Sequence, residues 1–349
     1  MNRLFVITGE ASGDLHAANF VKKFQKKSPN VEIQAMGGKE LQNVGVKLLF
    51  SYKEIAVMGF VDVLFKARFL KLKIQEVAKS IIDFEPDMVL LVDSSGFNLR
   101  LAKKIKQANP NLQIEYYIAP KYWAWGKWRI KKFIKYIDKL HCIFPFEVDF
   151  FKSNGFSNVH YVRNPTVNEI DAHQFKLPNS LRSIEKPIIA LLPGSRKQEI
   201  KRHLPLMLGV IEKYPTYHFV IAQAPGTNKI QYHNFLEGKK NISLLNGETW
   251  DLLKLSKAAI VCSGTATLET GIIGCPQVVM YKTSWLNYLL GKLLIKVKYI
   301  SLVNLIAEKE LVKEFIQKEA SVLNLQKELS LLLTTDHLAI KEILVEKLS

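Results

Sequence analysis

The sequence predicts an α/β fold built from two Rossmann-like parallel-sheet domains that face a cleft, with helices at the C-terminus. Three observations predict it. Short apolar runs alternate with amphipathic helical segments in both halves of the 349-residue chain, which is the pattern of parallel sheets. Several of these runs end in a turn rich in Gly and Ser that opens a helix. A hydrophobic content of 48% is enough to bury two cores.

The first half of the chain supplies the strands of one sheet. Its apolar runs predict strands at residues 4–8, 33–36, 88–92, 114–118 and 141–144. The first strand leads through a glycine turn into an amphipathic helix, and residues 41–44 form the helix after the second strand. In open parallel sheets, ligands bind beyond the carboxyl ends of the strands. Glu10 and Asp93, which each follow a strand, are therefore expected in the cleft.

The second half repeats this alternation. Its apolar runs predict strands at residues 188–192, 218–223, 242–245, 258–262 and 277–281. From residue 302 onward the sequence predicts helices without a strand. The resulting domains are residues 1–168 and 187–320, joined by a polar, proline-punctuated linker at 169–186. Residues 321–349 form C-terminal helices that can pack back on the first domain.

Composition limits the partners and the compartment. The formal charge of +17 predicts a polyanionic partner, which can be nucleic acid, anionic lipid or a phosphorylated substrate. The three cysteines are odd in number and lack C-x-x-C spacing, so neither a disulfide framework nor a zinc site is expected, as in a reducing cytoplasm. No uninterrupted apolar run reaches the ~18 residues of a membrane-spanning helix. We therefore expect a soluble or peripheral protein.

Residues 187–199, PIIALLPGSRKQE, organise the second domain. A buried strand ends in a Pro-Gly turn, and Ser195 and Arg196 stand at the mouth of a helix. Free backbone N–H groups with a hydroxyl and a fixed cation beside them suit a phosphate. The alternative is an ordinary strand-to-helix connection that carries a surface arginine.

The stretch 263–269, SGTATLE, has the same form after another strand. Its hydroxyls and amides gather at a positive helix end, and Glu269, about two turns from the start of that run, could accept both hydroxyls of a ribose. The alternative is a Ser/Thr cap with a solvated glutamate. Two such loops from one domain favour a nucleotide diphosphate. The P-loop, G-x-G-x-x-G and G-x-S-x-G motifs are absent, which argues against P-loop, dinucleotide-oxidoreductase and serine-hydrolase chemistry.

Other features of the chain leave alternatives open. Asp93 could act as a general base toward a sugar hydroxyl, or it could simply cap the turn that follows it. There is no D-x-D pair, so metal dependence is not indicated. The aromatic stretch 122–125 (YWAW) could stack on a base or a sugar, although packing in the core or cleft is favoured. Two apolar and basic segments, 60–72 and 286–300, suit a lipid interface, whereas each taken alone is typical of a core-facing helix.

Together these motifs resemble one family, the lipid A disaccharide synthases. The resemblance runs in the same order through nearly the whole chain, and several of its motifs are individually rare. The matching stretches are GEASGD (9–14), AVMGFVDVL (56–64), VDSSGFN (92–98), APKYWAW (119–125), LLPGSR (191–196), SGTATLE (263–269) and YISLVNLIAEKELVKEFIQ (299–317).

The resemblance implies a glycosyltransferase-B fold, with the acceptor on the first domain and the UDP-sugar on the second. The implied reaction joins UDP-2,3-diacylglucosamine to 2,3-diacylglucosamine 1-phosphate (lipid X) through a β-1,6 bond with inversion. It releases UDP without a metal or other cofactor. The resemblance also implies a cytoplasmic protein held peripherally at the inner face of the cytoplasmic membrane, with an anionic lipid surface as partner and no nucleic acid. The oligomeric state stays open.

The resemblance assigns roles residue by residue. Asp93 looks like the general base for the acceptor 6-hydroxyl, and Glu10 looks like an essential acid of the cleft. Arg196 looks like the cation that neutralises the leaving diphosphate. The other donor-site residues that it implies are Gly194, Ser195, Ser263, Gly264, Thr265, Ala266, Thr267, Glu269 and Asn304, and those on the acceptor side are Ser12, Gly13 and Met58.

The chain departs from the family pattern at two positions. Gly96 stands where many members have an acid, so a second carboxylate at that position beside Asp93 cannot be essential. Arg163 replaces the usual glycine before the linker, which alters that turn and could add a cation at the mouth of the cleft.

Other functions remain as alternatives. Among enzymes, they are the transferase that adds N-acetylglucosamine to the peptidoglycan lipid precursor and a UDP-sugar epimerase. A nucleic-acid-binding protein would explain the charge of +17, but no helix-turn-helix or zinc-finger signature supports it.

Overall fold

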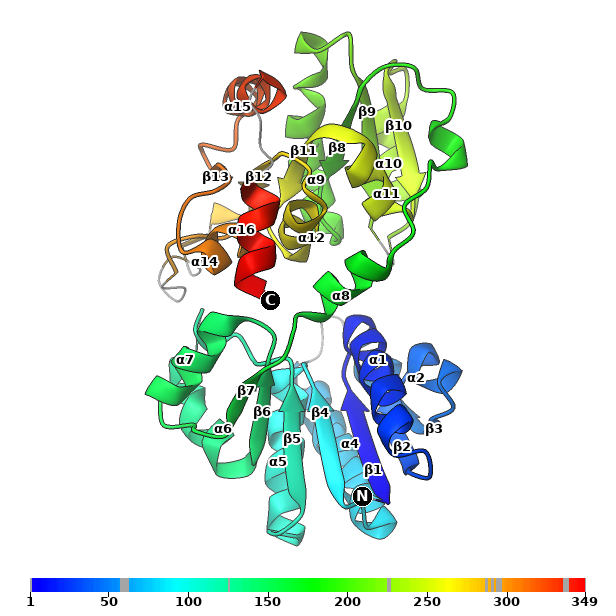
Figure 1. Ribbon diagram of the computed structural model, residues 1–349, viewed down its shortest axis with the longest axis vertical. Coiled ribbons are helices and arrows are strands. Elements are labelled where there is room, and N and C mark those ends of the chain that lie inside the picture. The colour runs from blue at the N-terminus through cyan, green and yellow to red at the C-terminus, as the bar shows by residue number, and fades with distance from the viewer. Residues whose placement is uncertain are drawn as a thin grey trace. The chain divides into compact units, whose positions relative to one another are not determined.

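The computed structural model describes residues 2–56, 63–124, 126–224, 227–285, 288–289, 292, 297–334 and 339–348. The chain divides into two compact units, Met1–Val162 and Arg163–Ser349 (Figure 1). Each unit contains one parallel sheet with helices packed on it, so the predicted α/β fold with two Rossmann-like sheets is confirmed.

The sheet of the first unit has seven parallel strands in the order β3-β2-β1-β4-β5-β6-β7. The strands are β1 (Arg3–Thr8), β2 (Glu32–Gly37), β3 (Lys47–Ser51), β4 (Met88–Val92), β5 (Gln113–Tyr117), β6 (Lys139–Cys142) and β7 (Val159–Tyr161). β1 pairs with β2 on one side and with β4 on the other, where Thr8 lies opposite Val92. The strand order reverses between β1 and β4, which is where open parallel sheets bind ligands.

Helices cover both faces of this sheet. They are α1 (Ala11–Lys27), α2 (Lys39–Asn43), α3 (Lys53–Ala56), α4 (Val63–Phe84), α5 (Ser95–Ala108), the 3-10 helix η1 (Lys127–Arg129), α6 (Ile130–Tyr136) and α7 (Pro145–Ser153). Side chains alternate along β1, so Leu4 and Val6 pack with α1, whereas Phe5 and Ile7 pack with α4 to α7. The central strand is therefore buried on both faces and its carboxyl end is fixed.

The sheet of the second unit has six parallel strands in the order β10-β9-β8-β11-β12-β13. The strands are β8 (Ile188–Leu192), β9 (His218–Gln223), β10 (Ile242–Asn246), β11 (Ser256–Cys262), β12 (Gln277–Tyr281) and β13 (Glu314–Ile316). Here the strand order reverses between β8 and β11, and Leu192 lies opposite Val261. In both sheets the strand order therefore reverses beside the first strand of the unit, β1 or β8.

The helices of the second unit include two that were expected at the C-terminus. The set is α8 (Pro165–Ala172), η2 (Asn179–Leu181), α9 (Lys197–Leu208), η3 (Ile211–Lys213), α10 (Ile230–Leu236), α11 (Thr249–Leu255), α12 (Thr265–Ile273), α14 (Leu302–Ala307), α15 (Val322–Thr334) and α16 (Ala339–Leu348). α15 packs against β11, β12 and α9, and α16 packs against α12 and α14. In the described part of the chain, no helix is both long enough and apolar enough to span a bilayer.

Most strand predictions are confirmed. The strands at 88–92, 188–192, 218–223 and 277–281 have the predicted bounds. The strand expected at 141–144 is β6, which begins and ends two residues earlier. It ends early because Pro145 begins α7 and Phe144 is the cap of that helix.

Three strands were not predicted, and all three lie at the edge of a sheet. They are β3, β7 and β13. The prediction that the chain contains no strand after residue 302 is wrong, because β13 pairs with β12 in parallel, with Glu314 opposite Val279. Edge strands are often short and only partly buried, and two of these have three residues. A strand of three residues is too short to show an alternation of apolar and polar side chains.

The segment 169–186, predicted as a linker, is packed on the second unit. α8 extends through Ala172 and contacts α12. After it, His173 Nε2 lies 3.1 Å from Asp251 Oδ1, and the Lys176 backbone N–H donates to the same oxygen at 2.7 Å. Asp251 is buried, so this segment is held by hydrogen bonds to the interior of the second unit.

Candidate functional site

In the first unit, two predicted acids start from neighbouring strand ends. Glu10 follows β1 and Asp93 follows β4, and the last residues of these strands lie opposite one another. Gly9 allows the two loops to approach, because a Cβ atom there would lie 2.1 Å from Ser94 Oγ. The structure thus brings Glu10 and Asp93 together at the reversal point of the sheet.

The backbone at Asp93 is strained and firmly held. Asp93 and Ser94 have φ values of 47° and 44°, in the left-handed region that costs energy for residues other than glycine. Asn98 Nδ2 donates to the Asp93 carbonyl at 2.7 Å, and the Tyr116 hydroxyl donates to the same oxygen. A strained backbone persists only where surrounding contacts hold it firmly, and such positions are common at functional sites.

The carboxyl group of Asp93 is electrostatically coupled to Glu10. Burial raises the pKa of Asp93 to about 6, and the charge of Glu10 and a hydrogen bond with it act in the same direction. The Ser94 backbone N–H and the charge of Lys121 oppose this rise. Ser94 is the cap residue of α5, and the Asp93 carboxyl accepts the Ser94 backbone N–H, so Asp93 both bonds the turn that follows it and interacts with Glu10. A carboxylate of this pKa is ionised at pH 7 yet basic enough to accept a proton.

The remaining acceptor-side residues lie around this pair or outside the described chain. Ser12 Oγ donates to Glu10 Oε1 at 2.8 Å, and Gly13 is buried in the first turn of α1. Met58 lies outside the described residues. Asp14 was not predicted, but its carboxylate accepts the backbone N–H groups of Gly38 and Glu40 and fixes the turn after β2.

The aromatic stretch beyond β5 is largely structural. Tyr122 is buried in the core of the first unit. The Trp123 indole N–H donates to Glu147 Oε1 at 3.1 Å, and Glu147 is buried at the start of α7, where burial raises its pKa to about 8. The prediction that these rings pack rather than stack on nucleic acid is confirmed for Tyr122 and Trp123.

In the second unit, the two predicted loops lie beside one another. The loop of Gly194, Ser195 and Arg196 follows β8, and the loop that begins at Ser263 follows β11, the strand paired with β8. Each loop opens a helix, α9 or α12. The arrangement matches the reversal point of the first sheet.

The mouth of α9 is occupied by a carboxylate of the chain itself. Glu199 Oε2 accepts the backbone N–H groups of Ser195 at 3.0 Å and Arg196 at 3.2 Å, and Glu199 Oε1 accepts Arg196 Nη1 at 2.7 Å. Gly194 is required here, because a Cβ atom would lie 2.6 Å from Glu199 Oε2 and φ is +109°. The expectation that these N–H groups are free is therefore wrong, since a glutamate three residues into the helix caps them.

A buried histidine supports the same loop. His203 Nδ1 lies 2.9 Å from the Pro193 carbonyl, and the Lys282 backbone N–H donates to His203 Nε2 at 2.9 Å. Burial lowers the pKa of His203, which agrees with a neutral ring that donates through Nδ1 and accepts through Nε2. His203 thereby ties the turn after β8 to the end of β12.

The second loop divides into exposed and internally bonded residues. Gly264 and Thr265 are exposed, and Ala266 is half-buried. The Ser263 hydroxyl donates to the Ile300 carbonyl at 2.7 Å. Thr267 is fully buried, and its hydroxyl donates to the Gly264 carbonyl at 2.8 Å.

Glu269 is held by an indole that the sequence did not reveal. Trp250 Nε1–H donates to Glu269 Oε2 at 2.8 Å, and burial raises the pKa of this half-buried carboxyl. The Trp250 ring stands perpendicular to His173 at 5.3 Å, and His173 is bonded to buried Asp251. Glu269 is therefore oriented from one side rather than freely solvated.

Asn304 has a structural environment. It is fully buried; its Nδ2 donates to the Val312 carbonyl and Glu314 Oε1, and its Oδ1 accepts the Leu311 and Val312 N–H groups, all within 2.7–3.0 Å. An amide can make four hydrogen bonds, and this one makes all four inside the chain. Its side chain braces the segment after α14.

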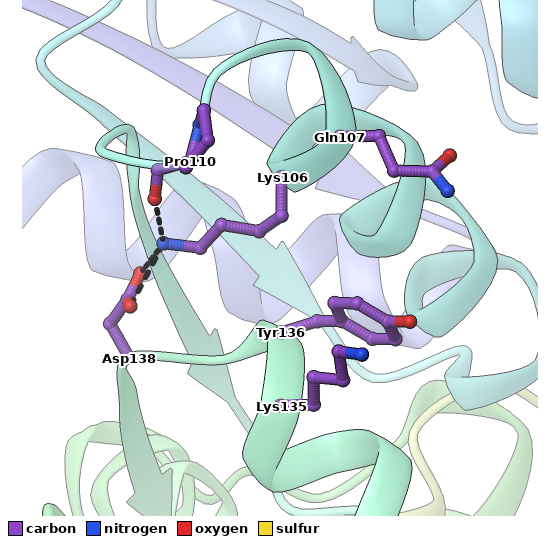
Figure 2. A pocket seen from close by; sticks show the side chains of 6 residues that line it. All are labelled: Lys106, Gln107, Pro110, Lys135, Tyr136 and Asp138. Atoms are coloured by element: carbon purple, nitrogen blue, oxygen red, sulfur yellow. Dashed lines mark hydrogen bonds and ion pairs between the residues drawn. The ribbon is translucent and has the colours of Figure 1, made fainter.

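One open cavity of about 410 Å³ lies away from these loops (Figure 2). It is found beside the residues that precede β5 and β6, at the sheet edge opposite the predicted site. Lys106, which lines it, is bonded to Asp138 at 2.7 Å and to the Pro110 carbonyl at 3.1 Å. Asp138, the carboxylate among the residues that line the cavity, is therefore already paired with a cation of the chain. Across the described residues, no group of three His, Cys, Asp or Glu side chains is arranged to hold a metal ion.

Comparison with known proteins gives a consistent result over the whole chain. A family model described as lipid-A-disaccharide synthetase matches residues 4–348. The lipid-A-disaccharide synthase of Myxococcus xanthus (strain DK1622) is 37% identical over 326 residues, which cover 91% of this chain and 84% of that protein. Lipid-A-disaccharide synthase 1 of Legionella pneumophila (strain Lens) is 34% identical over 338 residues, which cover 94% of this chain and 87% of that protein.

Solved structures are similar in fold. The S. aureus MnaA–UDP structure has a TM-score of 0.70 at 13% identity and covers 98% of this chain and 91% of that one. The UDP-GlcNAc 2-epimerase from Neisseria meningitidis bound to UDP-GlcNAc has a TM-score of 0.65 at 14% identity and covers 100% and 99% of the two chains. At these identities the likeness concerns the fold, which is the two-sheet architecture of glycosyltransferase-B enzymes and these epimerases.

Proposed function

The chain belongs to the lipid-A-disaccharide synthase family, and from this premise we propose how its two sheet edges carry out the reaction of that family. The protein is a glycosyltransferase that forms the lipid A disaccharide. The reaction joins UDP-2,3-diacylglucosamine to 2,3-diacylglucosamine 1-phosphate through a β-1,6 bond with inversion and releases UDP. An inverting transfer of this kind needs one base, one stabilised leaving group and alignment of two substrates.

The coupled pair of Asp93 and Glu10 is the observation that carries the proposal. Asp93 removes the proton from the acceptor 6-hydroxyl as the bond to the anomeric carbon forms. Its pKa of about 6 leaves it ionised at neutral pH and close enough to the working pH to be an effective base. Glu10 keeps the pKa of Asp93 raised, and Ser12 fixes the carboxylate of Glu10.

The second unit holds the donor. Arg196, whose side chain is 79% exposed, neutralises the diphosphate as it becomes the leaving group. Gly194, Ser195, Gly264, Thr265 and Ala266 form the loop surface around it, and Glu269 accepts the ribose hydroxyls. Ser263, Thr267 and Asn304 act by holding these loops in place, because their side chains are bonded within the chain.

The partners follow from the same proposal. Both substrates carry acyl chains, so the enzyme works where lipid is available, peripherally at the inner face of the cytoplasmic membrane. The charge of +17 favours contact with anionic lipid head groups. The segment 60–72, which suits a lipid interface, is described from Val63 onward as the start of α4, where Phe69 is 41% and Leu72 56% exposed. The other such segment, 286–300, lies in part outside the described residues, and Trp285, which immediately precedes it, is 73% exposed.

The proposal is tested with purified protein, the acylated UDP-sugar and the diacyl monosaccharide phosphate, with and without a chelator. We expect disaccharide and UDP in equal amounts in both cases. Unacylated UDP-N-acetylglucosamine serves as the control substrate, and its conversion to an epimer or to another glycoside would refute the assignment. Arg196→Ala should lower kcat/KM by on the order of 10²-fold.

A further inference from the structure

Basic side chains are concentrated in the segment of the first unit that contains α5, η1 and α6. Residues 94–137 contain ten Lys or Arg side chains and a single acid, Glu115, and the next residue, Asp138, is paired with Lys106 at 2.7 Å. Glu115 is buried and paired with His141 at 2.6 Å and with Lys139 at 3.7 Å, so it does not neutralise these cations. α5 and α6 bury their apolar residues in the same core. Most Lys and Arg side chains of these two helices are exposed to solvent.

An exposed tryptophan stands among these cations. Trp128 in η1 is 66% exposed, whereas Ile130 and Phe133 of the following helix are buried. At 100° per residue, Trp128, Lys131 and Lys135 fall on one stripe, with Lys132 beside them. The Arg129 guanidinium lies 5.2 Å from the Trp128 ring centre. Figure 2 shows Lys135 and Tyr136 at the far end of this stripe, next to Lys106 and Gln107.

This combination differs from an ordinary solvated helix face. The apolar side of α6 is already used in the core, so the exposed indole is not needed to pack that helix. A large aromatic ring flanked by cations is typical of segments that lie at a lipid interface, where the indole sits among head groups and the cations meet anionic lipid. Nucleic-acid surfaces interleave several exposed aromatics with their cations, whereas Trp128 is the exposed ring among the described residues of η1 and α6.

The basic segment of η1 and α6 follows a loop that leaves the sheet at the same edge as the proposed base. η1 follows the loop after β5, and β5 pairs with β4, which ends at Asp93. Lys127 and Trp128 therefore lie close in sequence to the sheet edge where the acceptor hydroxyl reacts. A lipid surface in contact with η1 would present acylated substrate near that edge.

We propose that η1 and α6, through Trp128, Lys131, Lys132 and Lys135, form the docking surface for anionic lipid head groups. The inference rests on the proposed function and specifies which part of the chain meets the membrane. The adjoining cations of α5 and η1 extend the same surface: Arg100, Lys103, Lys104, Lys127 and Arg129. Each cation near an anionic surface contributes roughly a factor of five in affinity.

The test is sedimentation with vesicles of phosphatidylcholine, with and without phosphatidylglycerol. The triple variant Lys131→Gln, Lys132→Gln, Lys135→Gln should lower partition to the anionic vesicles by on the order of 10²-fold. Trp128→Ser should lower it by roughly ten-fold. The matched control is Lys22→Gln, Lys23→Gln, Lys26→Gln on the exposed face of α1, which removes the same charge and should change partition by less than about three-fold.

The outcomes separate this inference from the proposed function. Equal losses in the triple variant and the α1 control would show that only net charge matters and would overturn it. Wild-type partition in the Trp128 and triple variants, with disaccharide synthesis intact, would overturn it and leave the function standing. Tighter binding to single-stranded RNA than to anionic vesicles at physiological salt would assign the surface to nucleic acid instead. Urea unfolding that matches wild type shows that both variants are folded.

Discussion

Replacing Asp93 with an asparagine should remove activity and stabilise the fold at the same time. An asparagine has the shape of the protonated carboxyl group and cannot take the proton of the acceptor hydroxyl. A positioned base contributes 10²–10⁴-fold, so we expect kcat to fall by about that factor while the affinity for UDP stays near wild type. Asp83→Asn, at an exposed acid of the same unit, is the matched control.

The stability effect follows from the pKa of Asp93. The folded-state pKa of about 6 lies above the usual 3.8, so the folded chain binds this proton more tightly than the unfolded chain does. The contribution of this proton to the free energy of unfolding is therefore lost as the pH rises from about 4 through about 6. The difference in pKa corresponds to at most about 3 kcal/mol. The amide in the Asp93→Asn variant has no charge to bury, so the variant avoids this cost.

Urea unfolding at pH 4 and pH 8 measures the effect. The Asp93→Asn variant should unfold at a higher urea concentration than wild type at pH 8, and the two should coincide at pH 4. A variant that is inactive but no more stable at pH 8 would refute the electrostatic account. Near-normal turnover with intact UDP binding would refute the base assignment itself.

Three further predictions concern neighbours of the proposed sites. Glu10→Gln removes a charge that raises the pKa of Asp93, so the acid limb of the kcat/KM profile should move below pH 6; an unmoved limb would show that burial alone sets it. Glu199→Gln removes an anion from the Arg196 loop, so UDP should bind roughly 3–10-fold more tightly by calorimetry, and weaker binding by a folded variant would mean that Glu199 positions Arg196 instead. Trp250→Phe keeps an aromatic ring but removes the donor to Glu269, so preference for UDP over 2′-deoxy-UDP should fall several-fold. The same change in a Glu269→Ala background should have no further effect, and an additive effect would contradict the coupling.

The sequence was most informative about buried strands and the turns that follow them. Central strands such as 88–92 and 188–192 have continuous apolar runs because both of their faces are buried. Their predicted carboxyl ends then locate Asp93 and Arg196 without knowledge of the strand order. The edge strands escaped prediction because they are short and half-exposed, so tertiary pairing rather than pattern decides their conformation.

Contacts between distant residues could not be predicted. Trp250 and Glu269 belong to different helices, and nothing in their spacing shows that the indole N–H reaches the carboxylate. The hydrogen bonds of Asn304 could not be predicted for the same reason, because its four partner groups come from the segment after α14. Glu199 did carry a signal. A glutamate at the third position of a predicted helix is a recognised cap, and it competes with any external anion for the same N–H groups.

The two units prepare their proposed sites by opposite electrostatic arrangements. At Asp93 the fold buries a carboxylate beside Glu10 and on a strained backbone. The ionised form is therefore destabilised, and protonation of the carboxylate is favoured. At the mouth of α9 the fold satisfies the cation and the N–H groups with its own carboxylate. A reacting base benefits from the first arrangement because its proton affinity drives the transfer. A donor can bind at the mouth of α9 only if its diphosphate displaces the Glu199 carboxylate. The affinity for the donor therefore depends on how much more strongly the loop binds diphosphate than it binds Glu199. UDP should therefore bind weakly before reaction and be released readily after it, which suits a leaving group.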